Sequence, residues 1–170
     1  RTPIGKSHRG FFRHTRPDDL LAATLKAVLA QAPTLDPGAI EDIVCGCAIP
    51  EGQQGLNVAR VAAVLAGLPT RVGGITVNRF CASGLQAVAD AAARIRTGEA
   101  DIMIGAGTES MSAMPQIMGN KVSMNPAIFA HEENIGMAFG MGLTGEKVAE
   151  RWKISREDQD AFALASHQKA

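Results

Sequence analysis

The stretch GITVNRFCASGLQAVADAAARIRTGEADIMIGAG, residues 74–107, decides the fold. It opens with a short apolar run at 74–77, passes through an alanine-rich segment that ends at Gly98, and closes with a second apolar run at 100–107. These segments are predicted to form a strand, a helix and a strand. The second run shows no alternation of apolar and polar residues, which is typical of a strand with helices on both faces.

The middle segment is predicted to be a helix because apolar residues recur in it at helical spacing. These residues are Leu85, Val88, Ala89, Ala92 and Ile95. On its N-terminal side the sequence predicts a helix from 17 to about 31, a strand at 41–49 and a helix within 56–69. Alternating strands and helices indicate an α/β fold whose sheet is parallel and whose crossovers are right-handed.

The C-terminal part of the chain is less regular. Residues 109–142 are rich in methionine, glycine and asparagine and show no clear period. A stretch of this length without secondary structure is usually functional when it lies inside a compact domain. Two helices are predicted after it, one from 144 to about 152 and one from Ser155, where Asp158 follows the capping serine after three residues.

The composition excludes several classes of partner. Lysine plus arginine and aspartate plus glutamate both number 17, so the formal charge is zero and no broad basic field attracts nucleic acid or anionic lipid. No apolar run reaches the roughly 18 residues that span a bilayer. The N-terminal RTPIGKSHRGFFRH also lacks the apolar core of a secretory signal. We therefore expect a cytoplasmic protein with neither nucleic acid nor membrane as a partner.

Three patterns resemble metal or nucleotide sites but have simpler interpretations. Cys45 and Cys47 form a CxC pair without a partner pair nearby, which falls short of a four-ligand site, so we expect reduced, buried strand residues. The segment GMGLTG, residues 140–145, matches GxGxxG but follows an irregular segment, and Glu146 stands where a phosphate loop needs lysine. His131 and the two glutamates after it are expected in a solvated turn. The sequence predicts no metal and no bound cofactor.

Cys81 lies where the predicted strand meets the predicted helix. The thiolate is the nucleophilic form of cysteine, and the amide groups and macrodipole of a helix N-terminus stabilise a nearby anion. The same amide groups could hold an oxyanion once Cys81 had attacked a carbonyl. Cysteine is also among the most buried residue types, so Cys81 could instead fill space in a core. The local pattern leaves both interpretations open.

Longer stretches carry a family resemblance. They are RTPIGK, GQQGLNVARVAAVLAGLP, VNRFCASGLQAVADAAARI, GEADIMIGAGTESMS, MGLTGEKVAE and ISREDQDAFALASHQKA, and together they cover nearly all 170 residues. With these motifs the chain resembles the N-terminal half of the thiolases, the family of acetyl-CoA C-acyltransferases and acetyl-CoA acetyltransferases. The cysteine of NRFCASG is the acyl-accepting nucleophile in that family, which implies the same role for Cys81.

The resemblance implies an acyltransferase that cleaves 3-ketoacyl-CoA by thiolysis, giving acetyl-CoA and a shortened acyl-CoA through an acyl-cysteine intermediate, as in fatty acid breakdown. An acetyl-CoA acetyltransferase that forms acetoacetyl-CoA is one alternative. A thiolase-like or truncated protein that binds acyl-CoA without chemistry is another. The family implies acyl-CoA and CoA as substrates, with no separate cofactor, and a homodimer or homotetramer.

The implied fold is the layered α/β thiolase fold with a parallel-rich sheet, of which this chain would be the N-terminal half. Residues 1–108 would form the core without its first strand, 109–142 part of a loop domain over the active site, and 143–170 helices of a truncated chain. Met141 is expected to line the substrate pocket, and Glu109 to lie in a turn that positions the loop domain. The family's catalytic histidine and second cysteine belong to its C-terminal half, so the chain alone is expected to be inactive.

Overall fold

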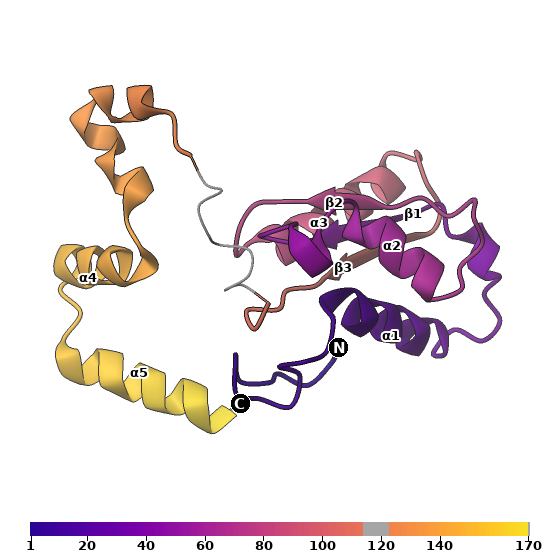
Figure 1. Cartoon of the computed structure of the whole chain (residues 1–170), viewed down its shortest axis with the longest axis horizontal. Coiled ribbons are helices and arrows are strands. Elements are labelled where there is room, and N and C mark those ends of the chain that lie inside the picture. Colours follow the sequence, from indigo (N-terminus) through magenta and orange to yellow (C-terminus); the bar gives the residue numbers. More distant parts are fainter. Residues whose placement is uncertain (114–122, 170) are drawn as a thin grey trace. The chain divides into compact units, whose positions relative to one another are not determined.

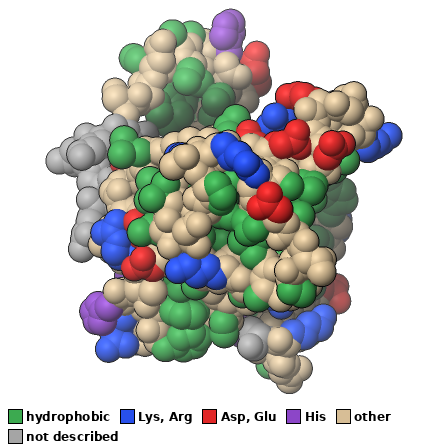
Figure 2. All heavy atoms as spheres, turned by 90° about the vertical axis from the view of Figure 1, so that its right-hand side faces the viewer, with side chains coloured by type: hydrophobic (Ala, Val, Ile, Leu, Met, Phe, Trp, Pro, Cys, Tyr) green, Lys and Arg blue, Asp and Glu red, His purple; other side chains and the backbone are tan. Residues whose placement is uncertain are grey.

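The computed structural model describes residues 1–113 and 123–169. The chain forms two compact units, Arg1–Gly119 and Asn120–Ala170. Charged side chains of both signs are interspersed with hydrophobic ones on the face drawn in Figure 2. Within the part of the chain described, no helix combines the length and the apolar composition needed to cross a membrane.

A three-stranded sheet forms the centre of the first unit (Figure 1). Its strands are β1 (Asp42–Gly46), β2 (Ile75–Val77) and β3 (Met103–Gly107). β1 lies between the other two and is parallel to both, so that Val44 pairs with Ile75 on one side and with Gly105 on the other. This arrangement confirms the predicted parallel sheet of an α/β fold.

All three strands are shorter than the sequence predicted, β2 by the single residue Gly74. At β1 and β3, glutamate side chains take the place of strand neighbours beyond the strand ends. Before β3, the N–H groups of Asp101 and Ile102 donate to Oε2 of Glu41 at 2.6 and 3.1 Å. After β1, the N–H group of Ala48 donates to Oε2 of Glu109 at 2.7 Å. The predicted ranges 41–49 and 100–107 therefore extend beyond the strand pairing itself.

Three helices cover the two faces of the sheet: α1 (Pro17–Leu29), α2 (Val58–Leu65) and α3 (Ser83–Arg96). Ile43 and Cys45 of β1 belong to a buried cluster with residues of α1 and α2. Val44, between them, belongs to a second buried cluster with Ala87 and Ala91 of α3. Alternate residues of β1 thus face different helices, which confirms the prediction of a sheet covered on both faces.

The side chains whose spacing predicted α3 are not the ones that pack on the sheet. Ala87 and Ala91 are buried there instead. The helix lies close to the sheet, since a Cβ added at Gly105 would be 3.0 Å from Cα of Val88. Small side chains fit so short a separation, whereas the larger apolar ones stay accessible to solvent: Leu85, Val88 and Ile95 are 76%, 53% and 42% exposed.

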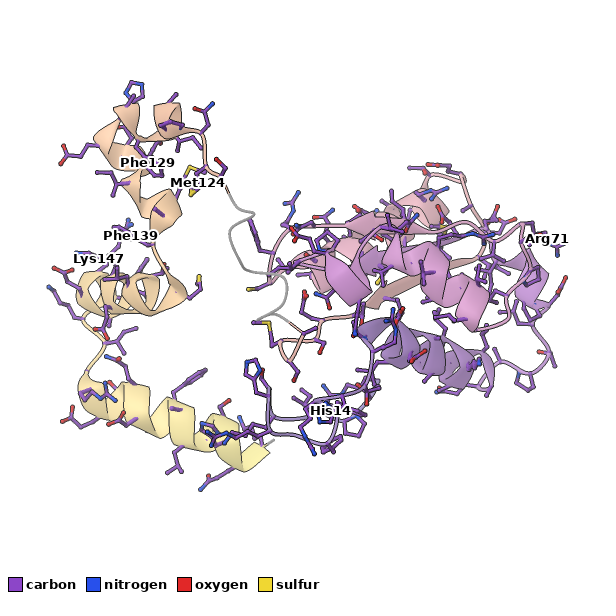
Figure 3. The ribbon with its side chains drawn as sticks, viewed as in Figure 1. His14, Arg71, Met124, Phe129, Phe139 and Lys147 are labelled. Atoms are coloured by element: carbon purple, nitrogen blue, oxygen red, sulfur yellow. The ribbon has the colours of Figure 1, made fainter. Side chains whose placement is uncertain are left out.

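The second unit is helical. It contains two 3-10 helices, Pro126–Ala130 and Glu132–Ala138, followed by α4 (Met141–Trp152) and α5 (Arg156–Lys169). The half-exposed side chains of Met124, Phe129 and Phe139 belong to its first part (Figure 3). Among residues 123–169, no side chain is buried.

The stretch 109–142, predicted to be irregular, is thus partly helical, and its residues 114–122 lie outside the described part of the chain. α4 begins three residues before the predicted start at 144, because the N–H of Thr144 donates to the carbonyl of Gly140 at 3.1 Å and closes an earlier turn. The predicted cap of α5 is confirmed. The hydroxyl of Ser155 accepts from the N–H of Asp158 at 3.1 Å and donates to its carboxylate at 2.7 Å.

Candidate active site

A tight turn carries Cys81 between β2 and α3. Phe80 has a left-handed backbone with φ of 46°, and its N–H donates to Oδ1 of Asn78 at 2.8 Å. The hydroxyl of Ser83 accepts from the N–H of Arg79 at 2.8 Å and donates to the carbonyl of Phe80 at 2.6 Å. Two side chains, one on each side of the cysteine, therefore hold the turn.

Cys81 is an exposed, free cysteine. Ser83, two residues later, is the first residue of α3. The thiol thus lies at the N-terminal end of a 14-residue helix, where the macrodipole favours a negative charge. This exposure at the end of a helix favours a reacting thiol over a side chain that fills a core.

The carboxyl ends of the three strands meet around a cavity of about 440 Å³ beside Cys81. Ala48 and Ile49 come from the segment after β1, Phe80 from the segment after β2, and Met111 from the segment after β3. Parallel sheets commonly place ligand sites at this edge. The largely apolar walls suit a hydrocarbon chain next to a nucleophile.

The other two cysteines are buried, as predicted, although Cys47 lies one residue beyond β1 rather than within it. Burial disfavours the thiolate and raises the pKa of Cys45 to about 12, with repulsion from Cys47 as the second cause. Burial likewise raises the pKa of Cys47 to about 11, followed by the effect of the nearby carboxylate of Glu109. Both are therefore protonated thiols at neutral pH.

Glu109 also lines the cavity and joins two segments of the cavity wall. In addition to accepting from Ala48, it accepts hydrogen bonds through Oε1 from Nε2 of Gln54 and from Sγ of Cys47, the latter at 3.9 Å. Gln54 is fully buried. Sequence reasoning expected Glu109 in a positioning turn and missed Gln54, because the run GQQG has no periodicity that marks a buried amide.

Met141 belongs to the second unit, where it is the first residue of α4 and is 73% exposed. With Ile154 and Phe162 it lines a cavity of about 650 Å³ in that unit. These neighbours are apolar, which is compatible with contact to an acyl or pantetheine chain. Its role in substrate binding stays a prediction.

The patterns that resembled metal and nucleotide sites lie in other surroundings. The glycines of 140–145 follow the 3-10 helix Glu132–Ala138 and enter α4, whereas a dinucleotide site requires a strand before them. His131 is an exposed residue directly before that same 3-10 helix. Among the described residues, no three potential metal ligands gather in one place.

Comparison with known proteins gives one consistent family. The family model described as "Thiolase, N-terminal domain" matches residues 1–170. The chain is 48% identical over 170 residues to the 3-ketoacyl-CoA thiolase of Bacillus subtilis, covering 100% of this chain and 42% of that protein. It is 47% identical over 171 residues to the 3-ketoacyl-CoA thiolase of Aliivibrio salmonicida, covering 100% of this chain and 43% of the relative.

A solved structure agrees with these sequence matches. The dimeric peroxisomal thiolase of Saccharomyces cerevisiae superposes on the chain with a TM-score of 0.86 at 32% identity, covering 99% of this chain and 44% of the yeast chain. The chain therefore spans less than half the length of the relatives that it matches.

Proposed function

Because this chain belongs to the thiolase family, we propose that the complete protein cleaves 3-ketoacyl-CoA by thiolysis and that Cys81 accepts the acyl group. The observation that carries the proposal is the location of Cys81. It is exposed, lies in a strand-to-helix turn and lines a cavity with largely apolar walls. The two bacterial relatives, both named 3-ketoacyl-CoA thiolase, support this direction over the acetyl-CoA acetyltransferase alternative.

In the proposed reaction the thiolate of Cys81 attacks the 3-keto carbon of the substrate. The bond between C2 and C3 breaks, its electron pair stays on C2, and protonation of C2 releases acetyl-CoA. The acyl group remains on Cys81 as a thioester, which the thiolate of a second CoA attacks to give the shortened acyl-CoA and restore Cys81. Covalent catalysis of this kind replaces one difficult carbon-carbon cleavage by two easier steps.

The N-terminus of α3 supplies the electrostatic part of this mechanism. A helix N-terminus favours negative charge, and amide groups at this end are suited to hold the oxyanion formed at the keto carbon. CoA enters as a substrate, and the steps balance without a redox group or a metal. The proton transfers require an acid and a base, which we assign to the family's histidine and second cysteine in the remaining part of the protein.

The assembly and location of the complete protein are also proposals. We propose a homodimer, which is supported by the description of the yeast thiolase as dimeric. A cytoplasmic location rests on the sequence alone and stays a prediction. Both can be examined on the full-length protein, by light scattering and by cell fractionation.

Mass spectrometry tests the proposed nucleophile directly. The full-length protein is incubated with acetoacetyl-CoA in the absence of free CoA, digested, and analysed peptide by peptide. We expect an acetyl group on the peptide that contains Cys81 and its loss when CoA is added. A protein that binds acetoacetyl-CoA but never carries the adduct would be a non-catalytic member of the family, and the proposed function would be wrong.

A further inference from the structure

Two glutamates bind backbone amide groups at opposite ends of the sheet. Glu41 lies before β1 and accepts from the N–H groups of Asp101 and Ile102, which lie before β3. Glu109 lies after β3 and accepts from the N–H group of Ala48, after β1. Because the strands are parallel, only Glu109 is at the edge that carries Cys81.

The second oxygen of Glu109 extends this connection. Its Oε1 accepts from Nε2 of Gln54, and the same amide group donates to the carbonyl of Ile49 at 2.8 Å. The amide oxygen of Gln54 accepts from the N–H of Ser110 at 3.1 Å. The segment 48–54 and the end of β3 are therefore joined by a closed network of hydrogen bonds around one buried amide.

This network determines one wall of the cavity beside Cys81. Ala48 and Ile49 line that cavity, and both are bonded to the network through their backbone groups. Glu109 is itself exposed, whereas its partner Gln54 is fully buried. A carboxylate is a strong acceptor, and a hydrogen-bonded network loses more than one contact when a member is changed. A shift of segment 48–54 would move the wall without touching the turn that holds the cysteine.

We propose that Glu109 is a positioning residue for the acylation of Cys81: it holds segment 48–54 so that the acyl group enters the cavity beside the thiol. The inference rests on the proposed function. Both carboxylate oxygens of Glu109 accept hydrogen bonds from this segment, so its role is to place the wall rather than to transfer a proton. Glu41 makes the same kind of backbone contacts at the other end of the sheet and serves as the matched control.

The experiment compares Glu109→Gln with Glu41→Gln in the full-length protein. Acylation of Cys81 is followed by mass spectrometry over a range of acetoacetyl-CoA concentrations, and alkylation of Cys81 by iodoacetamide is followed in parallel. For Glu109→Gln we expect the concentration for half-maximal acylation to rise roughly tenfold, with the alkylation rate unchanged, because this small reagent does not need the wall. Both variants should lower the melting temperature to a similar degree, but Glu41→Gln should leave the acylation of Cys81 unchanged.

A second variant separates positioning from general damage. Gln54→Met keeps a side chain of similar size at this buried position but removes its hydrogen bonds to Glu109, Ile49 and Ser110. We expect it to raise the concentration for half-maximal acylation roughly tenfold as well, with the alkylation rate unchanged. If circular dichroism shows that Glu109→Gln is unfolded, Glu109→Asp, which keeps the charge but shortens the reach, takes its place with the same expected result.

The outcomes distinguish the inference from the function on which it rests. Absence of the adduct in the wild type would overturn the proposed function itself. A wild type that is acylated, with Glu109 variants acylated equally well or with acylation and alkylation falling together, would overturn the positioning role alone.

Discussion

Two neighbouring strands of one sheet end in cysteines with opposite surroundings. At the end of β1, Cys45 and Cys47 are buried, and burial raises the pKa of each thiol. After β2, the chain instead makes a left-handed turn at Phe80 and presents Cys81 at the start of a helix, exposed beside a cavity. Location at the carboxyl edge of a sheet is therefore not enough to expose a thiol. The left-handed turn before α3 is the difference.

The largest expected difference in activity is between variants that replace the exposed thiol and variants that replace a buried one. Cys81→Ser should reduce thiolysis on the order of 1,000-fold or more, because the weaker nucleophile cannot form the acyl intermediate. Its fold should be retained, since the side chain is exposed. Thiolysis assays and circular dichroism of the full-length protein measure both. Cys47→Ala should keep the acyl adduct on Cys81, and its loss in that variant would break the comparison.

A methyl group added at Gly46, next to the turn that holds Cys81, should have the next largest effect on the acylation rate. A Cβ at Gly46 would overlap the backbone of Ser83, so Gly46→Ala should displace the turn that holds Cys81. A misplacement of about 1 Å can cost on the order of 100-fold in rate. The acylation rate at saturating acetoacetyl-CoA measures this cost.

Gly105→Ala is the matched control for this methyl group. Its Cβ would press on the middle of α3, at 3.0 Å from Cα of Val88. It should lower stability while changing acylation far less than Gly46→Ala does. Equal rates for the two variants would show that close packing at Gly46 does not position Cys81.

Removal of the hydroxyl that holds the turn should have a smaller effect. Ser83→Ala leaves the N–H of Arg79 without its acceptor and removes one of two donors to the carbonyl of Phe80, which keeps the N–H of residue 83. We expect a loss of about 1–3 kcal/mol in the free energy of unfolding and a roughly tenfold slower acylation. Urea unfolding and adduct kinetics test these values. Ser155→Ala removes a similar pair of bonds from the start of α5 and should leave the acylation rate unchanged.

The buried thiols should show themselves in the pH dependence of stability. The unfolded chain loses thiol protons above the ordinary pKa of 9.0, whereas folded Cys45 keeps its proton to about pH 12. The contribution of the two buried thiols to the free energy of unfolding is complete below pH 9. It is lost as the pH rises from there, by up to about 1.4 kcal/mol per pH unit for each thiol. Urea unfolding at pH 8 and pH 10 should give a steeper fall for the wild type than for Cys45→Ala. Parallel slopes would contradict the raised pKa.

The placement of Cys81 follows from the sequence, because an apolar run, a short polar segment and a helical repeat define a strand, a turn and a helix in that order. The orientation of α3 does not. Its spacing shows that one face is apolar, but size decides which residues pack on the sheet. The backbone of α3 approaches Gly46 at Ser83 and Gly105 at Val88, and the small side chains of Ala87 and Ala91 pack against Val44. Periodicity carries no information about such a close approach.

The network around Glu109 was also beyond the reach of the sequence. Glu109 and Gln54 are separated by 55 residues, and neither occurs in a local pattern that requires the other. Their contact arises only when the ends of β1 and β3 meet at one edge of the sheet. Prediction from the sequence therefore extends to the location of Cys81 between strand and helix and stops short of the residues that shape the cavity beside it.

Protonated, buried thiols are poor partners for an oxidised cysteine. Peroxide converts an exposed thiol to a sulfenic acid, and closure of an internal disulfide then requires attack by a second thiolate. Neither Cys45 nor Cys47 supplies that thiolate at neutral pH, since burial keeps both protonated. Neither buried thiol of this chain would therefore resolve an oxidised Cys81, so closure of a disulfide would require a cysteine outside residues 1–170.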